Sequence, residues 1–381
     1  MCVAEDVKPL CIEIRQSQLD DLARRIDMAR WPEKETVGDW SQGVPLQAMQ
    51  DLVGYWRKDY EWRRCEDWLN ESGQSITRID GLDIHFLHVR SPVENATPLV
   101  MTHGWPGSVV EFRDVIGPLT DPEAHGGRAQ DAFHLVMPSL PGFGFSGKPE
   151  GTGWGVERIA RAWGVLMERL GYTRWFAQGG DWGSAVTTAI GVQKVPGCAG
   201  IHLTMPIARP QPEDLAAPGP DEQRALAALQ HYQEWDSGYS TQQRTRPQTI
   251  GYSLVDSPVG LAAWIYEKMW AWTDNAGSPE EALSRDAILD NIMLYWLPAT
   301  GASSARLYWE SFGSFSPQTV QMPVAVSAFP KEIIPAARKW CERVFPDLVH
   351  WGDMEQGGHF AAWEQPGAFT AELRKAFAAM R

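Results

Sequence analysis

The chain has 381 residues, 44% of them hydrophobic and 22% charged, which predicts a globular protein longer than one average domain. Its formal net charge of −14 argues against a nucleic-acid partner, because phosphate binding requires a basic surface. The five cysteines show neither paired nor metal-ligand spacing, so we expect reduced structural thiols rather than disulfides or a zinc site; they are Cys2, Cys11, Cys65, Cys198 and Cys341.

The N-terminal sequence "MCVAEDVKPLCIEIRQ" mixes acidic and apolar residues and has neither a basic region nor an apolar core typical of a signal peptide. No stretch reaches the roughly 18 consecutive apolar residues of a membrane span. Even "GLAAWIYEKMWAW" is interrupted by Glu267 and Lys268. These features predict a cytoplasmic protein that does not enter a membrane.

Residues 1–75 are predicted to be helical. Ser17 and Asp20 have the spacing of a helix cap, and the first helix is expected to end at Trp31-Pro32. A second amphipathic helix is predicted over 46–70, where tryptophan and tyrosine recur at helical spacing and are expected to be core residues.

From Ile76 the hydrophobic period changes to two. The segment 75–91 alternates around Asp80-Gly81, which is typical of a β-hairpin. Apolar strand candidates and amphipathic helices then alternate as far as residue 205, with strands at 98–104, 133–140, 174–180 and 198–205 and helices at 156–171 and after Asp181. Such alternation predicts a mostly parallel sheet covered by helices on both faces, which is an α/β fold.

The alternating pattern breaks after residue 205. A proline-rich stretch is followed by helical segments crowded with tryptophan and tyrosine, which predicts an inserted helical cap. The strand pattern returns at 323–330, and a helix, a strand, a loop and a final helix follow. We therefore divide the chain into four segments. An N-terminal helical meander that braces the cap covers 1–75, the first part of the α/β core 76–205, the cap 206–320, and the remainder of the core 321–381.

One short turn carries the strongest chemical signal. A predicted strand is followed by the motif Gly-x-Asp-x-Gly and then by a predicted helix. This is the layout of a nucleophile elbow in which Asp181 replaces the usual serine. Gly179 and Gly183 fit this reading because the sharp turn leaves no room for side chains at these positions. An aspartate before a helix is also a common N-cap, but capping does not require a glycine on each side. The predicted fold is therefore the α/β-hydrolase fold.

A nucleophile elbow requires an oxyanion hole made of two backbone amides. The residue after the nucleophile, Trp182, is expected to supply one of them. The loop "THGWPGS" directly follows the strand "PLVM", and we assign the second amide to Trp105. The alternative is that His103-Gly104 forms only a tight turn.

The histidine base is expected late in the chain. In "EQGGHFAAWEQP", His359 lies on a glycine-rich loop before the last helix, as the hydrolase chain order of nucleophile, acid and histidine requires. Four other histidines fall within predicted strands and are expected to be ordinary sheet residues; they are His85, His88, His134 and His202.

The acid that orients the histidine should follow the penultimate strand. Glu332 in "AFPKEIIP" fits that position. Asp353 and Glu355 are alternatives, although they lie only six and four residues before His359 on the expected loop. The segment "LTMPIARP", after the strand that precedes the cap, offers no acid.

An aspartate nucleophile changes the class of substrate. A carboxylate is already ionised at neutral pH and takes up an alkyl group, so the histidine is free to activate water against the resulting ester. Epoxides and alkyl halides are open to such attack, and an epoxide oxygen also needs proton donors. Composition does not choose among the tyrosines of the cap, each of which also suits packing; they are Tyr232, Tyr239, Tyr252, Tyr266, Tyr295 and Tyr308.

The chain resembles the microsomal-type epoxide hydrolases, a group of α/β-hydrolases with an N-terminal meander. The resemblance covers nearly the whole chain and is specific because many motifs occur in one order, namely "ARWPE", "HGWPGSVVEF", "PSLPGFGFSGKP", "GGDWG", "DSPVGLAAWIYEK", "YWLP" and "GGHFAAWEQP". By position it implies that Asp181 is the nucleophile, Glu332 the acid and His359 the base. The two ring-opening tyrosines fall on Tyr239 in "DSGY" and Tyr308 in "ARLYWE".

The same resemblance assigns the oxyanion amide to Trp105 and implies a cis peptide before Pro106. Membrane-bound relatives carry an N-terminal anchor, whereas this chain begins with the meander and so resembles the soluble bacterial and fungal members. No metal or organic cofactor is expected. The expected partners are a small-molecule epoxide and water, and the oligomeric state stays open, with a homodimer as one alternative.

Relatives of this type act on xenobiotic epoxides or on natural-product intermediates such as enediyne precursors. The tryptophan-rich cap favours a bulky or aromatic epoxide of the second kind, although core packing explains most of the rings equally well; they include Trp182, Trp264, Trp270, Trp272, Trp296 and Trp309. Two other functions are considered. One is a haloalkane or haloacid dehalogenase in which the Trp182 indole binds halide, and the other is a non-catalytic protein that only binds a ligand.

Overall fold

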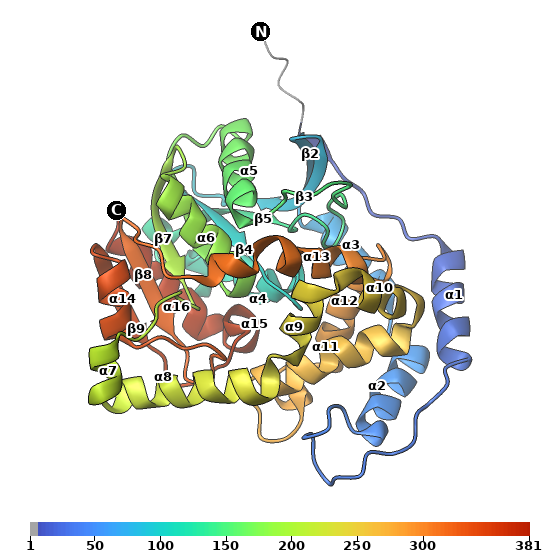
Figure 1. Cartoon of the computed structure of the whole chain (residues 1–381). Coiled ribbons are helices and arrows are strands. Elements are labelled where there is room, and N and C mark those ends of the chain that lie inside the picture. Colours follow the sequence, from blue (N-terminus) through green and yellow to red (C-terminus); the bar gives the residue numbers. More distant parts are fainter. Residues whose placement is uncertain (1–6) are drawn as a thin grey trace.

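The computed structural model describes residues 7–381 (Figure 1), and Cys2 and the first six residues of the N-terminal sequence lie outside this range. Its centre is a nine-stranded sheet in the order β1-β2-β3-β5-β4-β6-β7-β8-β9. The strands are β1 (Lys8–Pro9), β2 (Gln74–Ile79), β3 (Leu82–Val89), β4 (Thr97–Thr102), β5 (Phe133–Pro138), β6 (Trp175–Gly179), β7 (Cys198–Leu203), β8 (Val324–Ala328) and β9 (Leu348–Asp353). The pairs from β5 to β9 are parallel and the first three pairs are antiparallel, which confirms the predicted hairpin and the mostly parallel sheet.

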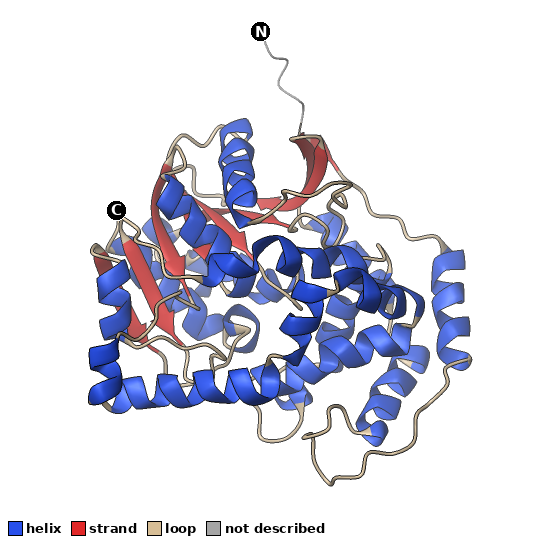
Figure 2. Ribbon diagram, viewed as in Figure 1, coloured by secondary structure: helices blue, strands red, loops and turns tan. Residues whose placement is uncertain are grey.

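Helices cover both faces of the sheet, as predicted (Figure 2). Helix α5 packs against α6, and α4 packs against α16. The central strands are apolar on both sides, so each face needs a helical layer to exclude water; in β4, for example, Leu99, Val100 and Met101 are fully buried. The core helices are α4 (Arg113–Thr120), α5 (Val156–Arg169), α6 (Asp181–Gln193), α14 (Arg338–Val344), α15 (Ala361–Glu364) and α16 (Pro366–Ala378).

A run of helices, here called the inserted helices, separates β7 from β8 and appears in yellow to orange in Figure 1. Several of them begin with proline at the first turn, and Ser257 and Ser284 cap two of them by accepting from the amides of Gly260 and Ala287. They are α7 (Pro212–Ala216), α8 (Pro220–His231), α9 (Gly238–Thr245), α10 (Pro247–Asp256), α11 (Pro258–Trp272), α12 (Arg285–Trp296) and α13 (Gly301–Ser311), with a π-helical turn at Tyr232–Asp236.

From residue 7 onward, the N-terminal segment forms three helices: α1 (Gln16–Asp27), α2 (Leu46–Lys58) and α3 (Trp62–Glu71). Two predictions about it were wrong. Ser17 does not cap the first helix, because the N-cap is Arg15 and the helix already ends at Asp27. The helix predicted over 46–70 is broken after Lys58, and the chain turn there directs the Tyr60 hydroxyl to the Asp290 carboxylate on α12, at 2.8 Å.

This segment packs on the inserted helices, since α1 and α2 contact α11 and α3 contacts α12. The Tyr55 hydroxyl donates to Asp286 Oδ1 at 3.0 Å. The ring of Trp40 stacks on that of Trp270, with centroids 5.0 Å apart and planes 4° apart. Side chains far apart in sequence therefore tie the N-terminal helices to the inserted ones.

Two of the six tryptophans considered for a binding pocket pack against other side chains instead, and a third is largely exposed. Trp270 stacks on Trp40, and Trp296 lies under the guanidinium of Arg25. Trp309 is 53% exposed. Packing therefore accounts for part of the aromatic richness of the inserted helices.

The four described cysteines are free, and Cys65 and Cys341 are buried. None of the helices between residues 7 and 381 combines the length and the hydropathy that a membrane span requires. The same part of the chain has no cluster of three or more histidine, cysteine, aspartate or glutamate side chains arranged to hold a metal ion.

Candidate active site

The predicted elbow lies at the junction of β6 and α6. Asp181 adopts a φ of 48°, in the left-handed region that a residue with a side chain seldom occupies. A Cβ on Gly179 would overlap the backbone of Gly183, and a Cβ on Gly183 would overlap the carbonyl group of Thr102 on β4. The prediction that this turn leaves no room for side chains is therefore confirmed.

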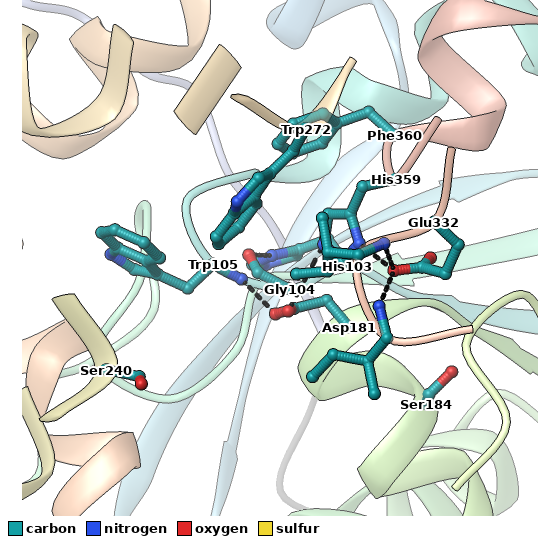
Figure 3. Close-up of polar contacts among 12 residues, drawn as sticks. His103, Gly104, Trp105, Asp181, Ser184, Ser240, Trp272, Glu332, His359 and Phe360 are labelled. Carbon is teal, nitrogen blue, oxygen red and sulfur yellow. Dashed lines mark hydrogen bonds and ion pairs between the residues drawn. The ribbon is translucent and has the colours of Figure 1, made fainter. Parts of the chain in front are cut away.

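The loop after β4 approaches the Asp181 carboxylate (Figure 3). The Trp105 amide donates to Asp181 Oδ1 at 2.7 Å. A Cβ on Gly104 would overlap the carboxylate, so only glycine permits this approach. The Trp105-Pro106 peptide is cis. The Trp182 amide belongs to the first turn of α6, where amides lack helical partners, and it makes no hydrogen bond to Asp181.

His103 stabilises the same loop from within. Its Nδ1–H donates to the Gly104 carbonyl at 2.9 Å, and its Nε2 accepts from the Leu140 amide at 3.2 Å. Burial lowers the pKa of His103 to about 4, so the ring is neutral. His103 therefore has a structural role beside the Trp105 amide.

Helix α12 fixes the outer half of this loop. Asn291 Nδ2 donates to the Pro106 carbonyl and the Tyr295 hydroxyl donates to the Gly107 carbonyl, both at 2.7 Å. The Ser108 hydroxyl in turn donates to Asn291 Oδ1 at 2.7 Å. Our reading of the sequence missed Asn291, although its spacing of four residues from Tyr295 places both on one face of a helix.

His359 lies between two carboxylates. Its Nδ1 donates to Glu332 Oε1 at 2.8 Å, and its Nε2 lies 3.4 Å from Asp181 Oδ2. All three side chains are nearly inaccessible to solvent. The alternative acids Asp353 and Glu355 are exposed, and Asp353 accepts from the indole of Trp351.

The charge state of His359 follows from this arrangement. Burial by itself lowers the pKa of the imidazole, but the charges and hydrogen bonds of Glu332 and Asp181 outweigh it. The pKa of His359 therefore lies well above its usual value, and the resting site contains an imidazolium between two carboxylates.

A partly buried carboxyl group that the sequence analysis missed shapes the histidine loop. Glu364 accepts hydrogen bonds from the backbone amides of Gly358, Phe360 and Asp274, at 3.0, 2.9 and 2.6 Å. The His359 amide donates to the carbonyl of Trp272 at 2.9 Å. The loop that carries His359 is thus bound to the end of α11.

Tyr239 and Tyr308 line a cavity of about 350 Å³ into which Asp181 also faces. Their ring centroids are 5.8 Å apart, and Trp105 stacks on Tyr239 at 4.9 Å. The Tyr239 hydroxyl lies 3.1 Å from that of Tyr232, whereas the buried Tyr308 hydroxyl has no hydrogen-bond partner among the described residues. Burial raises the pKa of both groups well above 10, so both keep their protons.

The remaining cap tyrosines have other surroundings. Tyr252 is 70% exposed, Tyr266 donates to Glu280, and Tyr295 holds the Gly107 carbonyl. Of the six candidates, only Tyr232, Tyr239 and Tyr308 line the cavity with Asp181.

The four strand histidines are in the predicted strands: His85 and His88 in β3, His134 in β5 and His202 in β7. Burial lowers the pKa of each of them. None of them lines the cavity with Asp181.

The mostly parallel sheet, with a strained aspartate at the turn between β6 and α6, defines this chain as a protein of the α/β-hydrolase fold. Residues 97–245 match the family described as "alpha/beta hydrolase fold", and residues 7–112 match the family described as "Epoxide hydrolase N terminus". The chain belongs to the epoxide hydrolase family.

Its relatives match over nearly the whole chain. A protein of Stigmatella aurantiaca (strain DW4/3-1) named "Putative epoxide hydrolase" is 56% identical, covering 98% of this chain and 86% of that protein. "Epoxide hydrolase 1" of Sus scrofa is 35% identical, covering 97% and 88%. The structure of Aspergillus niger epoxide hydrolase has a TM-score of 0.89 and 31% identity, covering 99% of this chain and 97% of that one. The resemblance inferred from sequence is confirmed.

Proposed function

We propose that this enzyme converts an epoxide and water into a vicinal diol through an alkyl ester on Asp181. The observation that carries the proposal is that the two oxygens of the Asp181 carboxylate have different surroundings. Oδ1 accepts a hydrogen bond from the Trp105 amide, while Oδ2 faces His359. Oδ2 is then the attacking atom, and Oδ1 becomes the carbonyl oxygen of the ester.

In the first step, Asp181 Oδ2 attacks an epoxide carbon and the carbon–oxygen bond of the ring breaks. Tyr239 and Tyr308 bind the ring oxygen and protonate it. The retained protons of both tyrosines and their position in the cavity with Asp181 support this role. The tyrosinate left by this transfer regains a proton from His359, which is an imidazolium at rest and becomes neutral.

Alkylation itself prepares the base. The ester is neutral, so one of the two charges that raise the pKa of His359 disappears when it forms. Neutral His359, oriented by Glu332, then takes a proton from water, and the hydroxide attacks the ester carbonyl. The amides of Trp105 and Trp182 stabilise the resulting oxyanion. Collapse releases the diol, restores the Asp181 carboxylate and leaves His359 protonated again.

The proposed substrate has a bulky or aromatic body, as in the natural-product, enediyne-type intermediates. A cavity of about 350 Å³, lined by the rings of Trp182, Tyr308 and Phe315, supports a ligand of this kind. The free, buried thiols of Cys65 and Cys341 support a location in the reducing cytoplasm. The packing of α1, α2 and α3 on the inserted helices supports the proposal that the N-terminal segment braces a cap.

A dehalogenase is the second candidate, because the buried Trp182 indole N–H donates to no partner among residues 7–381 within hydrogen-bonding geometry and would suit a halide. The deciding experiment is intact-protein mass spectrometry of His359→Gln after incubation with styrene oxide or a bromoalkane. Loss of the base should trap the ester, and an adduct with the full mass of styrene oxide supports the proposal. An adduct from the bromoalkane alone, short by HBr, would instead establish a dehalogenase.

A further inference from the structure

The cavity that contains Asp181 is also lined by two arginines, Arg209 and Arg244. Asp181 is the only acidic residue among those that line it. The reaction proposed above uses Asp181 but neither arginine.

Arg209 lies in the loop between β7 and α7 and is partly buried. Its Nη1 donates to the carbonyl of Ala208 at 3.1 Å, and within residues 7–381 it forms no ion pair. Burial lowers the pKa of the guanidinium, opposed by the nearby Tyr232, although an arginine remains charged at any physiological pH. The fold therefore holds a partly desolvated cation without a compensating carboxylate, which is costly unless a ligand supplies one.

Arg244 approaches the same cavity from α9. Its guanidinium lies 4.8 Å from the ring centroid of Phe312, and it has no carboxylate partner in the described part of the chain. It follows Tyr239 by five residues, which corresponds to about 7.5 Å along a helix axis. Arg244 and Tyr239 therefore line the same cavity from different turns of α9.

Some other cations in and around the inserted helices pair with carboxylates, although Arg306 on α13 is also partly buried and forms no ion pair within residues 7–381. Lys268 pairs with Asp236, and Arg343 and Lys339 both pair with Asp214. Because the chain carries a net charge of −14, its long-range field repels anions, and an anionic ligand would need local cations. Two unpaired arginines beside one carboxylate meet that need.

We propose that the physiological epoxide carries a carboxylate, which Arg209 binds inside the cavity and Arg244 attracts at its exposed side. The inference rests on the proposed function and specifies its substrate class. Arginine suits this ligand because its planar guanidinium donates two parallel hydrogen bonds to a carboxylate. The apolar part of the substrate would then pack against the rings and aliphatic side chains of the cavity.

The test compares kcat/KM for 10,11-epoxyundecanoate and 5,6-epoxyhexanoate with kcat/KM for their methyl esters, which have the same carbon chain but no charge. The unmodified enzyme should prefer at least one acid over its ester. Arg209→Met should lower this preference about tenfold or more, the effect of losing a hydrogen bond between charged groups. Arg209→Lys should restore part of it, and Arg244→Met should cause a smaller loss because Arg244 is exposed.

Arg246→Met is the matched control, because Arg246 follows α9, is exposed and does not line this cavity. It removes the same charge and should leave the preference unchanged. A second readout is inhibition of styrene oxide hydrolysis by undecanoate and by 1-undecanol. Undecanoate should inhibit more strongly, and Arg209→Met should abolish the difference even if it slows turnover of every substrate.

Two kinds of failure are distinguishable. Turnover of styrene oxide and the esters without preference for either acid, or a preference that survives in Arg209→Met, overturns the carboxylate inference alone. Absence of turnover with every epoxide overturns the proposed function and this inference with it.

Discussion

Replacing Glu332 by glutamine separates the two halves of the proposed reaction. The substitution keeps the volume of the side chain but removes the charge that lies 2.8 Å from His359 Nδ1. At an effective dielectric constant near 20, two charges at such a distance attract by about 6 kcal/mol. Breaking a buried ion pair costs about 3 to 5 kcal/mol.

Taking about 3 kcal/mol as the lost stabilisation of the imidazolium, the pKa of His359 falls by about two units. Hydrolysis of the ester, in which His359 becomes positively charged, should slow by about 100-fold. Alkylation does not require a base, so its rate should change only a few-fold. Because His359 accepts a proton only when neutral, hydrolysis rises with pH through its pKa, and this rise should move to lower pH in Glu332→Gln.

The assay is a single turnover of styrene oxide, quenched at successive times and followed by intact mass between pH 5.5 and 9. The variant should accumulate the Asp181 ester, which then decays slowly. Glu355→Gln is the matched control, since it removes an exposed acid from the same region and should behave like the unmodified enzyme. Equal slowing of both steps, or hydrolysis at the original rate, would refute the role assigned to Glu332.

Three further outcomes are expected. Tyr239→Phe and Tyr308→Phe should each slow ester formation by about 100-fold, without a matching effect on ester hydrolysis, in the same single-turnover assay. Ester hydrolysis that is faster than ester formation in both variants would support the tyrosine roles. An unchanged rate of ester formation would argue against them. Gly183→Ala should destabilise the fold by at least about 3 kcal/mol in urea unfolding, because its Cβ would overlap a β4 carbonyl group, whereas Gly54→Ala, at a helix position with open space, should be neutral or slightly stabilising. Burial raises the pKa of the Glu111 carboxyl to about 8, so the folded state binds this proton more tightly than the unfolded chain and loses stability as the pH rises from about 4.5 toward 8. Glu111→Gln should therefore raise the Tm at pH 8 and leave it unchanged at pH 4. Equal shifts of the Tm at both pH values would contradict this assignment.

The positions of the chemical groups along the chain follow from local sequence. Glycines on both sides of Asp181 identify the elbow because the steric demand of a strand-to-helix turn is local, and the alternation of apolar strands and amphipathic helices identifies the parallel sheet. The loop carrying Trp105 and the late histidine, His359, follow from their places relative to those strands.

Contacts between distant segments are a different matter. The helical spacing of apolar residues predicted one continuous helix over 46–70, because no feature of the local sequence shows that Tyr60 reaches Asp290 on α12. Sequence left three acids for His359, and only the folded chain brings Glu332 to its Nδ1 while Asp353 stays exposed.

Composition likewise left six cap tyrosines equivalent, and resemblance rather than physical reasoning singled out two. The tertiary structure puts Tyr239 and Tyr308 in the cavity with Asp181, sends Tyr252 to the surface and uses Tyr295 to hold the loop after β4. Within the described range, 7–381, it also leaves Arg209 without a carboxylate partner. Hydrogen bonds, burial and unpaired charge are properties of side chains that meet only after folding, so the sequence determined which groups are present and the tertiary structure decided which of them act together.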